Sequence, residues 1–218
     1  MERKCIFSVG EFYHVYNRGV EKRSIFTDKK DWDRFHKLLY LANSSQAFAF
    51  RELEDKGIDT IERGNPIVAI GAYVLMPNHF HVLVKEITQN GLSTFMKKLT
   101  TGYSMYFNKK HERVGPLFQG RFKAEHVIRD EHLKYLYVYI HLNPVKLIEP
   151  KWKEVGVKNK KRVFKFIEQY YYSSYEDYCN TKRQENKILT KDEFPEYFSH
   201  INKFRNYVDD WLNIKESY

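Results

Sequence analysis

The sequence predicts an α+β fold: a ferredoxin-like antiparallel sheet with helices packed on it, plus a C-terminal helical and basic extension. Three observations predict it. Two β-rich runs within residues 67–86 are separated by Pro77 and Asn78, a turn signal between antiparallel strands. Residues 11–18 alternate bulky and polar side chains, as a further strand does. Three other segments carry apolar residues at helical spacing.

The first half of the chain is expected to form a strand, a helix and a hairpin. EFYHVYNR at residues 11–18 ends before Gly19 and is the first strand. Residues 31–42 have the spacing of a helix, and residues 44–66 mix charges with glycine and proline, which indicates a partly helical stretch and then a loop. The runs IVAIGAYVLM and HFHVLVKE then form two strands, and a histidine pair opens the second.

A helix, a strand and a helix follow. Residues 92–108 form a helix with one basic face, and residues 117–128 resemble a strand or an extended arm. A helix then runs from about residue 131 to residue 142, closed by Asn143 and Pro144. We expect residues 1–150 to be the principal domain and residues 151–218 to be a basic, aromatic-rich extension packed on it.

The charge balance favours a polyanionic partner. The chain has 218 residues, with 37 Lys and Arg against 28 Asp and Glu, a formal charge of +9. Such a balance suits nucleic acid, although many proteins without that function share it. Aromatic residues make up 17% of the chain, and rings beside positive charge can stack on unpaired bases, but most of them must belong to the core.

Cysteine content and hydropathy indicate a cytoplasmic protein. Cys5 and Cys179 are too few and too far apart in the sequence for a disulfide framework or a cysteine zinc site. The longest apolar run, at residues 67–76, is about half of the roughly 20 residues that a membrane-spanning helix needs. The charged N-terminus also has no signal-peptide core, so no membrane association is expected.

The histidine pair of the hairpin has the spacing of two metal ligands. Side chains two apart on a strand share a face, so His79 and His81 can hold one cation while Phe80 turns to the core. Nine histidines in a chain of this length produce such a pair by chance often, so two hydrogen-bonded surface histidines are an equally good interpretation of the motif alone.

The helix near residue 140 adds a phenol and an amide. Tyr135, Tyr139 and Asn143 are four apart, which aligns them on one helix face. A tyrosine beside a metal-bound phosphate can attack phosphorus, and an amide oxygen can complete a metal shell. The alternative is that the tyrosines only pack the helix onto the sheet.

Three motifs in one order resemble the single-tyrosine HUH transposases, the IS200-like family, and especially the rep-associated tyrosine transposases. They are MPNHFHVLV at residues 76–84, GPLFQGRFK at residues 115–123 and YIHLNPVK at residues 139–146. The similarity extends from FYHVYNRG near residue 12 through YSSY at residues 172–175.

The resemblance implies a DNA endonuclease that nicks single-stranded or hairpin DNA, forms a covalent 5′-phosphotyrosine and rejoins strands. It implies Tyr139 as nucleophile, with Tyr135 as its rival one turn earlier, and His79, His81 and Asn143 as ligands of Mg²⁺ or Mn²⁺. Such relatives act either as monomers or as homodimers. Arg121, Lys123, Lys97 and Lys98 are candidates for phosphate contacts, each of which can equally be a solvated side chain.

Two other functions stay open from the sequence. The first is a nucleic-acid-binding module that keeps the fold and the basic surface but does not cut DNA. The presence of the complete histidine, tyrosine and asparagine set argues against it. The second is a metal hydrolase that activates water, with Tyr139 only orienting the substrate. A covalent protein–DNA adduct would distinguish the proposed chemistry from both.

Overall fold

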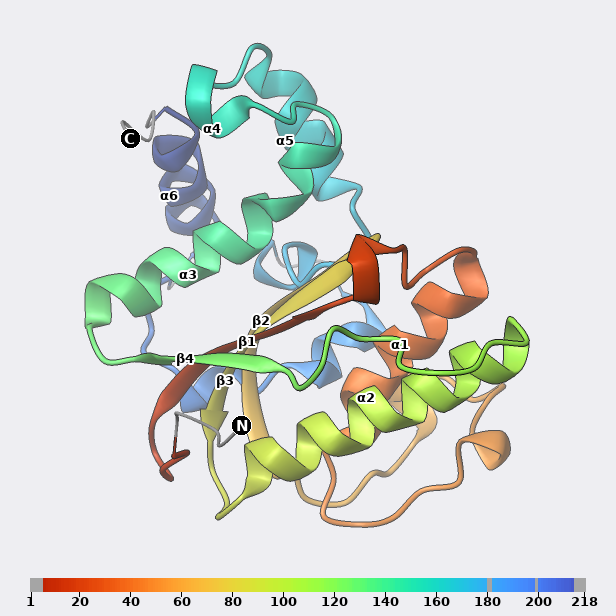
Figure 1. Ribbon diagram of the computed structural model, residues 1–218. Coiled ribbons are helices and arrows are strands. Elements are labelled where there is room, and N and C mark those ends of the chain that lie inside the picture. Colours follow the sequence, from red (N-terminus) through yellow and green to blue (C-terminus); the bar gives the residue numbers. More distant parts are fainter. Residues whose placement is uncertain (1–5, 180–181, 199, 214–218) are drawn as a thin grey trace.

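The computed structural model describes residues 6–179, 182–198 and 200–213 (Figure 1). It contains four strands: β1 (Phe12–Arg18), β2 (Val68–Met76), β3 (His79–Glu86) and β4 (Lys123–Val127). Its α-helices are α1 (Lys29–Ala42), α2 (Gly91–Lys110), α3 (Asp130–Leu142), α4 (Trp152–Val155), α5 (Lys160–Glu168) and α6 (Ile201–Asn213). Short 3₁₀ helices cover Val20–Lys22, Phe50–Glu52, Ile58–Thr60, Asn143–Leu147, Glu176–Tyr178, Gln184–Ile188 and Lys191–Glu193.

The four strands form one antiparallel sheet in the order β2-β3-β1-β4. Along the chain the order is β1, α1, β2, β3, α2, β4, so the central strands β1 and β3 come from the two halves of the domain. This is the ferredoxin-like arrangement, and the predicted α+β fold class is confirmed.

Helices cover the two faces of the sheet differently. Helices α1 and α2 pack on one face, where Val15 of β1 and Phe80 of β3 meet Phe35 of α1 and Leu99 of α2 in the largest apolar cluster. Helix α3 lies across the other face, on the opposite side of the sheet in Figure 1. Because strand side chains alternate, every second residue of β1 and β3 points toward α3.

The segment predicted to be a strand or an extended arm, residues 117–128, contains both. Only β4 pairs with β1, whereas residues 117–122 form an irregular arm tied to the sheet by a bridge between Gly19 and Phe118. Gly120 has φ +74°, a left-handed conformation that interrupts a strand. Residues 44–66 form two 3₁₀ turns within loops.

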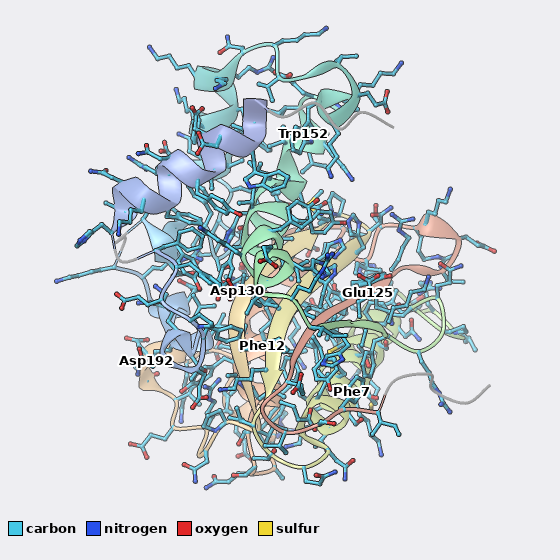
Figure 2. The ribbon with its side chains drawn as sticks, turned by 90° about the vertical axis from the view of Figure 1, so that its left-hand side faces the viewer. Phe7, Phe12, Glu125, Asp130, Trp152 and Asp192 are labelled. Atoms are coloured by element: carbon cyan, nitrogen blue, oxygen red, sulfur yellow. The ribbon has the colours of Figure 1, made fainter. Side chains whose placement is uncertain are left out.

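Residues 151–213, as far as they are described, build a helical layer beyond α3. Helices α5 and α6 share an apolar cluster with α3, and Trp152 of α4 joins it. Figure 2 shows Trp152 at the end of the molecule opposite Phe7. The chain then returns to the sheet, where Leu75 N–H donates to Tyr172 O at 2.9 Å and Ser174 N–H donates to Tyr73 O at 3.0 Å. This segment therefore covers the free edge of β2.

Two buried histidines, one of which is hydrogen-bonded to this segment, predict an acid-sensitive fold. His36 Nε2 lies 2.7 Å from the Tyr73 hydroxyl, and His141 Nε2 lies 2.7 Å from Ser174 Oγ. Burial lowers the pKa of each imidazole from 6.5 to about 3. The unfolded chain takes up these protons below pH 6.5 and the folded chain does not, so stability is present above pH 6.5 and is lost as the pH falls.

We expect each of these histidines to lower the free energy of unfolding by about 1.4 kcal/mol per pH unit below pH 6.5. Urea unfolding between pH 7.5 and 4.5, with EDTA present, measures the pH dependence of the unfolding free energy for the wild type and for His36→Gln. The variant should show the shallower dependence. Parallel dependences in the two proteins would contradict the contribution of His36.

Candidate active site

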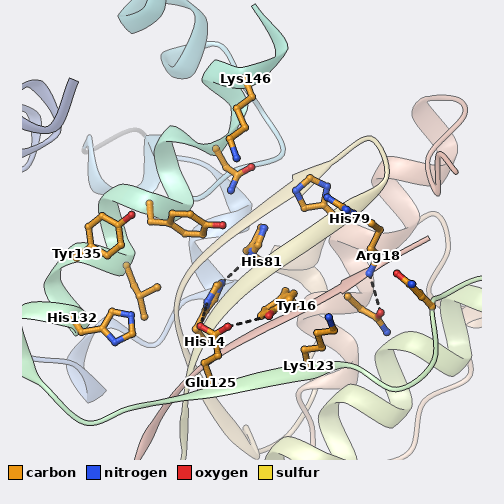
Figure 3. A pocket seen from close by; sticks show the side chains of 15 residues that line it. His14, Tyr16, Arg18, His79, His81, Lys123, Glu125, His132, Tyr135 and Lys146 are labelled. Carbon is orange, nitrogen blue, oxygen red and sulfur yellow. Dashed lines mark hydrogen bonds and ion pairs between the residues drawn. The ribbon is translucent and has the colours of Figure 1, made fainter. Parts of the chain in front are cut away.

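A cavity of about 520 Å³ lies between α3 and the sheet face that α3 covers (Figure 3). Strand β1, the start of β3, β4 and helix α3 all contribute to it. The lining residues are His14, Tyr16, Asn17, Arg18, His79, His81, Gln119, Lys123, Glu125, His132, Tyr135, Leu136, Tyr139, Asn143 and Lys146. The cavity therefore brings the predicted histidine pair together with Tyr139, its rival Tyr135 and Asn143.

The turn before β3 positions the histidine pair. His79 and His81 both line the cavity, with ring centroids 5.1 Å apart, and Phe80 between them is buried on the opposite face. His79 Nδ1 lies 2.6 Å from Oδ1 of Asn78, which fixes its ring. Burial lowers the pKa of His79 to about 4, with the positive charge of Arg18 acting in the same direction.

His81 is more deeply buried than His79. Burial, and then the neighbouring His14 and His79, lower the pKa of His81 well below its usual value. Both imidazoles are therefore neutral near pH 7 and keep a lone pair on one ring nitrogen. Neutral imidazole is the form that binds metal ions.

Helix α3 presents Tyr139 to the histidines. Its ring centroid lies 5.4 Å from that of His81 and 5.6 Å from that of His14, in both cases edge to face. The Tyr135 ring lies 5.9 Å from Tyr139 and 4.6 Å from Trp211 of α6. Tyr135 therefore lines the same cavity but is displaced toward the C-terminal helices.

Asn143 follows α3 directly and carries an unusual oxygen. The residue is 3% exposed, and its Oδ1 atom is buried without a hydrogen-bond partner in the described part of the chain. A buried amide oxygen without a partner costs free energy, and a bound cation can satisfy it. Among the described residues, no group of three or more His, Cys, Asp or Glu side chains is placed to hold a metal ion.

Several cavity residues were not singled out from the sequence, among them Arg18, Lys146 and the connected group of His14, Tyr16 and Glu125. His14 Nε2 lies 2.9 Å from His81 Nδ1, and its Nδ1 lies 3.6 Å from Glu125 Oε2. Tyr16 donates to Glu125 Oε1 at 3.0 Å, and burial followed by this carboxylate raises the pKa of Tyr16 to about 12. Tyr16 is therefore held in its neutral form and is a poor nucleophile. His14 and Tyr16 are two residues apart on β1 and share a face, but their place beside His81 follows from the pairing of β1 with β3.

Positive side chains surround the cavity. Arg18 and Lys123 approach from the sheet and Lys146 from the end of α3, as Figure 3 shows. Lys153 of α4 places its Nζ atom 5.3 Å from the centroid of the Tyr139 ring, so a residue beyond position 150 reaches the site. These charges favour a phosphate in the cavity.

The basic residues expected to contact DNA lie on different sides of the sheet. Lys123 lines the cavity, and Arg121 is exposed in the arm just before β4. Lys97 and Lys98 lie on α2, which packs on the opposite face of the sheet from α3. Lys98 donates to the carbonyl oxygens of Ser44 and Gln46 at 2.7 and 3.0 Å, which ties it to a loop. The structure thus brings Lys123 to the cavity and keeps Lys97 and Lys98 away from it.

Comparison with protein families gives one match. Residues 60–143 match the family described as transposase IS200 like. The resemblance to IS200-like transposases is confirmed. The matched segment contains His79, His81, Tyr139 and Asn143, and it begins after β1, which carries His14.

A solved structure with a similar fold is that of a REP-associated tyrosine transposase bound to a REP hairpin. It aligns with a TM-score of 0.51 and 14% sequence identity, over 85% of this chain and 90% of the other. A comparison with curated proteins finds no match. Among the described residues, no helix is both long and apolar enough to cross a membrane.

Proposed function

We propose that the chain is a transposase-like DNA endonuclease and strand transferase that nicks single-stranded hairpin DNA through a 5′-phosphotyrosine. The observation that carries the proposal is one cavity shared by Tyr139, His79, His81 and the unpartnered amide oxygen of Asn143. The match to IS200-like transposases supports DNA as the substrate. The REP hairpin bound by the structural relative supports a hairpin form of that DNA.

His79, His81 and Asn143 are the proposed ligands of Mg²⁺ or Mn²⁺. When bound, the divalent cation polarises a non-bridging phosphate oxygen and stabilises the charge that develops in the transition state. His79 and His81 would each supply an imidazole nitrogen to the cation, and Asn143 would supply an amide oxygen. Their fit to a cation is supported by the low pKa values of His79 and His81 and by the orphaned Oδ1 of Asn143.

Tyr139 is the proposed nucleophile. Its phenolic oxygen attacks the scissile phosphorus, the bond from phosphorus to the 3′-oxygen breaks, and the phenol proton passes to solvent. The departing 3′-oxygen takes up a proton and leaves as a hydroxyl. The reverse attack of a 3′-hydroxyl on the phosphotyrosine rejoins DNA and releases Tyr139, so no nucleotide cofactor is consumed.

The cationic side chains have two proposed roles. Arg18, Lys123 and Lys146 neutralise the phosphates on either side of the scissile bond. Lys153, beside the Tyr139 ring, stabilises negative charge on the attacking oxygen. Residues 151–218 are therefore proposed to be an extension that assists the catalytic domain formed by residues 1–150.

The proposed site needs one chain only. We propose that the side chains of one chain carry the reaction, in a monomer or in each half of a homodimer. Because the proposed substrate is DNA, we also propose that the protein acts in the cytoplasm.

The proposal is tested with labelled hairpin-containing single-stranded DNA from the flanks of the gene, on a denaturing gel. In Mn²⁺ we expect a shifted band that survives denaturation, and with EDTA we expect none. Cleavage that releases both ends without an adduct would favour water activation. Binding without cleavage in Mn²⁺ would favour a non-catalytic module.

A further inference from the structure

A third histidine lies behind the proposed metal ligands. His14 of β1 is 4% exposed, and its Nε2 atom lies 2.9 Å from Nδ1 of His81, which is 6% exposed. The two rings are stacked, with centroids 5.0 Å apart and an interplanar angle of 19°. Figure 3 shows this contact on the sheet side of the cavity. His14 is thus a buried polar group whose neighbour is another imidazole.

The register of the sheet creates this contact. On one side, β1 pairs with β3 so that Tyr16 is opposite His81, and His14 is two residues from Tyr16 on the same face. On the other side, β1 pairs with β4 so that His14 is opposite Glu125. The Glu125 carboxylate lies 3.6 Å from His14 Nδ1 and accepts a hydrogen bond from Tyr16, which holds it in place.

These contacts determine which nitrogen of His81 faces the cavity. Nδ1 of His81 is directed to His14, so only Nε2 is left for a cation. A neutral imidazole has one N–H and one lone pair, and Nε2 has the lone pair only when the proton is on Nδ1. That tautomer requires His14 Nε2 to be an acceptor, and hence the His14 proton to be on Nδ1, toward Glu125.

We propose that His14 and Glu125 are positioning residues that orient His81 and hold it in the Nδ1–H tautomer, ready to bind a cation through Nε2. The Glu125 carboxylate favours the His14 proton on Nδ1, His14 Nε2 then accepts from His81 Nδ1–H, and the cavity side of His81 is left basic. The inference rests on the proposed function for the identity of the cation. The tautomer itself is a property of the metal-free protein.

The first measurement uses wild-type protein without metal. Two-bond ¹H–¹⁵N correlation spectra at pH 7.5, with His81 assigned by comparison with His81→Gln, distinguish the two neutral tautomers. We expect the pattern of Nδ1–H for His81 and for His14. An Nε2–H tautomer of His81 would overturn the proposal, whether or not the protein binds DNA.

The second measurement compares Mn²⁺ affinity, by electron paramagnetic resonance of free Mn²⁺, in His14→Leu and His14→Gln. We expect His14→Leu to lose roughly 10- to 100-fold in affinity, as removal of groups behind metal ligands generally does. His14→Gln should recover most of it, because its amide oxygen can accept from His81 Nδ1–H. Equal affinities for a folded His14→Leu and the wild type would overturn the proposal.

A third variant avoids the buried position. Glu125 is exposed on the edge strand β4, so Glu125→Gln removes the carboxylate charge without opening the core. We expect a mixture of His81 tautomers and weaker Mn²⁺ binding in this variant, with unchanged thermal stability. An unchanged tautomer in Glu125→Gln would overturn the role of Glu125. Failure of wild-type protein to bind Mn²⁺ would instead contradict the proposed function.

Discussion

Tyr139→Phe is expected to abolish the covalent protein–DNA adduct and to lower cleavage by at least about 1,000-fold, while hairpin binding is retained. The change removes one oxygen from a half-buried ring that lies 5.4 Å from His81 and 5.6 Å from His14. The phenyl ring keeps its packing, so the fold should not change. Denaturing gels for the adduct and mobility shifts for binding measure the two effects separately.

Tyr135→Phe is the matched control. Tyr135 lies one turn earlier on α3 and lines the same cavity, but its ring is against Trp211 of α6. We expect this variant to form the adduct as the wild type does. Adduct formation by Tyr139→Phe together with its loss in Tyr135→Phe would instead make Tyr135 the nucleophile.

The second large effect is expected at the proposed metal ligands. His81→Ala removes one imidazole, and Asn143→Leu replaces the amide by an apolar group of similar size. Each should weaken Mn²⁺ binding by at least about 10-fold, because a lost ligand costs no less than a lost supporting group. Calorimetric titration of metal-free protein with Mn²⁺ measures the binding, and the denaturing gel measures the accompanying loss of the adduct.

Two controls accompany the variants of the proposed metal ligands: the variant Asn143→Asp and measurements of stability. Aspartate keeps an oxygen where Asn143 has one, so we expect Asn143→Asp to bind Mn²⁺. The side chain of Asn143 also interacts with His79, so the unfolding free energy of metal-free Asn143→Leu is measured beside its Mn²⁺ affinity to separate loss of a ligand from loss of stability. Wild-type Mn²⁺ affinity in Asn143→Leu would contradict the assignment of Asn143 as a ligand.

Most of the fold could be predicted because its pattern is local. The alternation in β1, the turn at Pro77 and Asn78, and the helical spacing in α2 and α3 each identify an element without knowledge of the rest of the chain. For residues 117–128 the sequence left a strand and an extended arm open, and only residues 123–127 form the strand. Residues 117–122 have no continuous strand pairing with β1, and Gly120 interrupts the extended backbone with a left-handed conformation.

The candidate site was predictable where its residues share one element. His79 and His81 are two apart on β3, and Tyr139 precedes Asn143 by four residues, so periodicity alone put each pair on one face. The contact of His14 with His81 depends on the register between β1 and β3, which no local pattern encodes. His14 and His81 are far apart in the sequence, so this contact could not be predicted from it.

The sequence predicted that the extension after residue 150 packs on the domain, but not by which contacts. In the structure, Tyr172 and Ser174 form main-chain hydrogen bonds with the edge strand β2. Lys153 lies beside the ring of Tyr139, within a four-residue helix that sequence periodicity cannot detect. Both contacts join segments that are distant in the sequence, so they can be recognised only in the tertiary structure.

The most direct measurement of the central claim is mass spectrometry of the protein–DNA adduct. After digestion by protease and nuclease, we predict a 5′-phosphonucleotide attached to Tyr139 in wild-type protein incubated with hairpin DNA and Mn²⁺. A nucleotide attached to Tyr135 or Tyr16, or cleaved DNA with no modified tyrosine at all, would contradict the account.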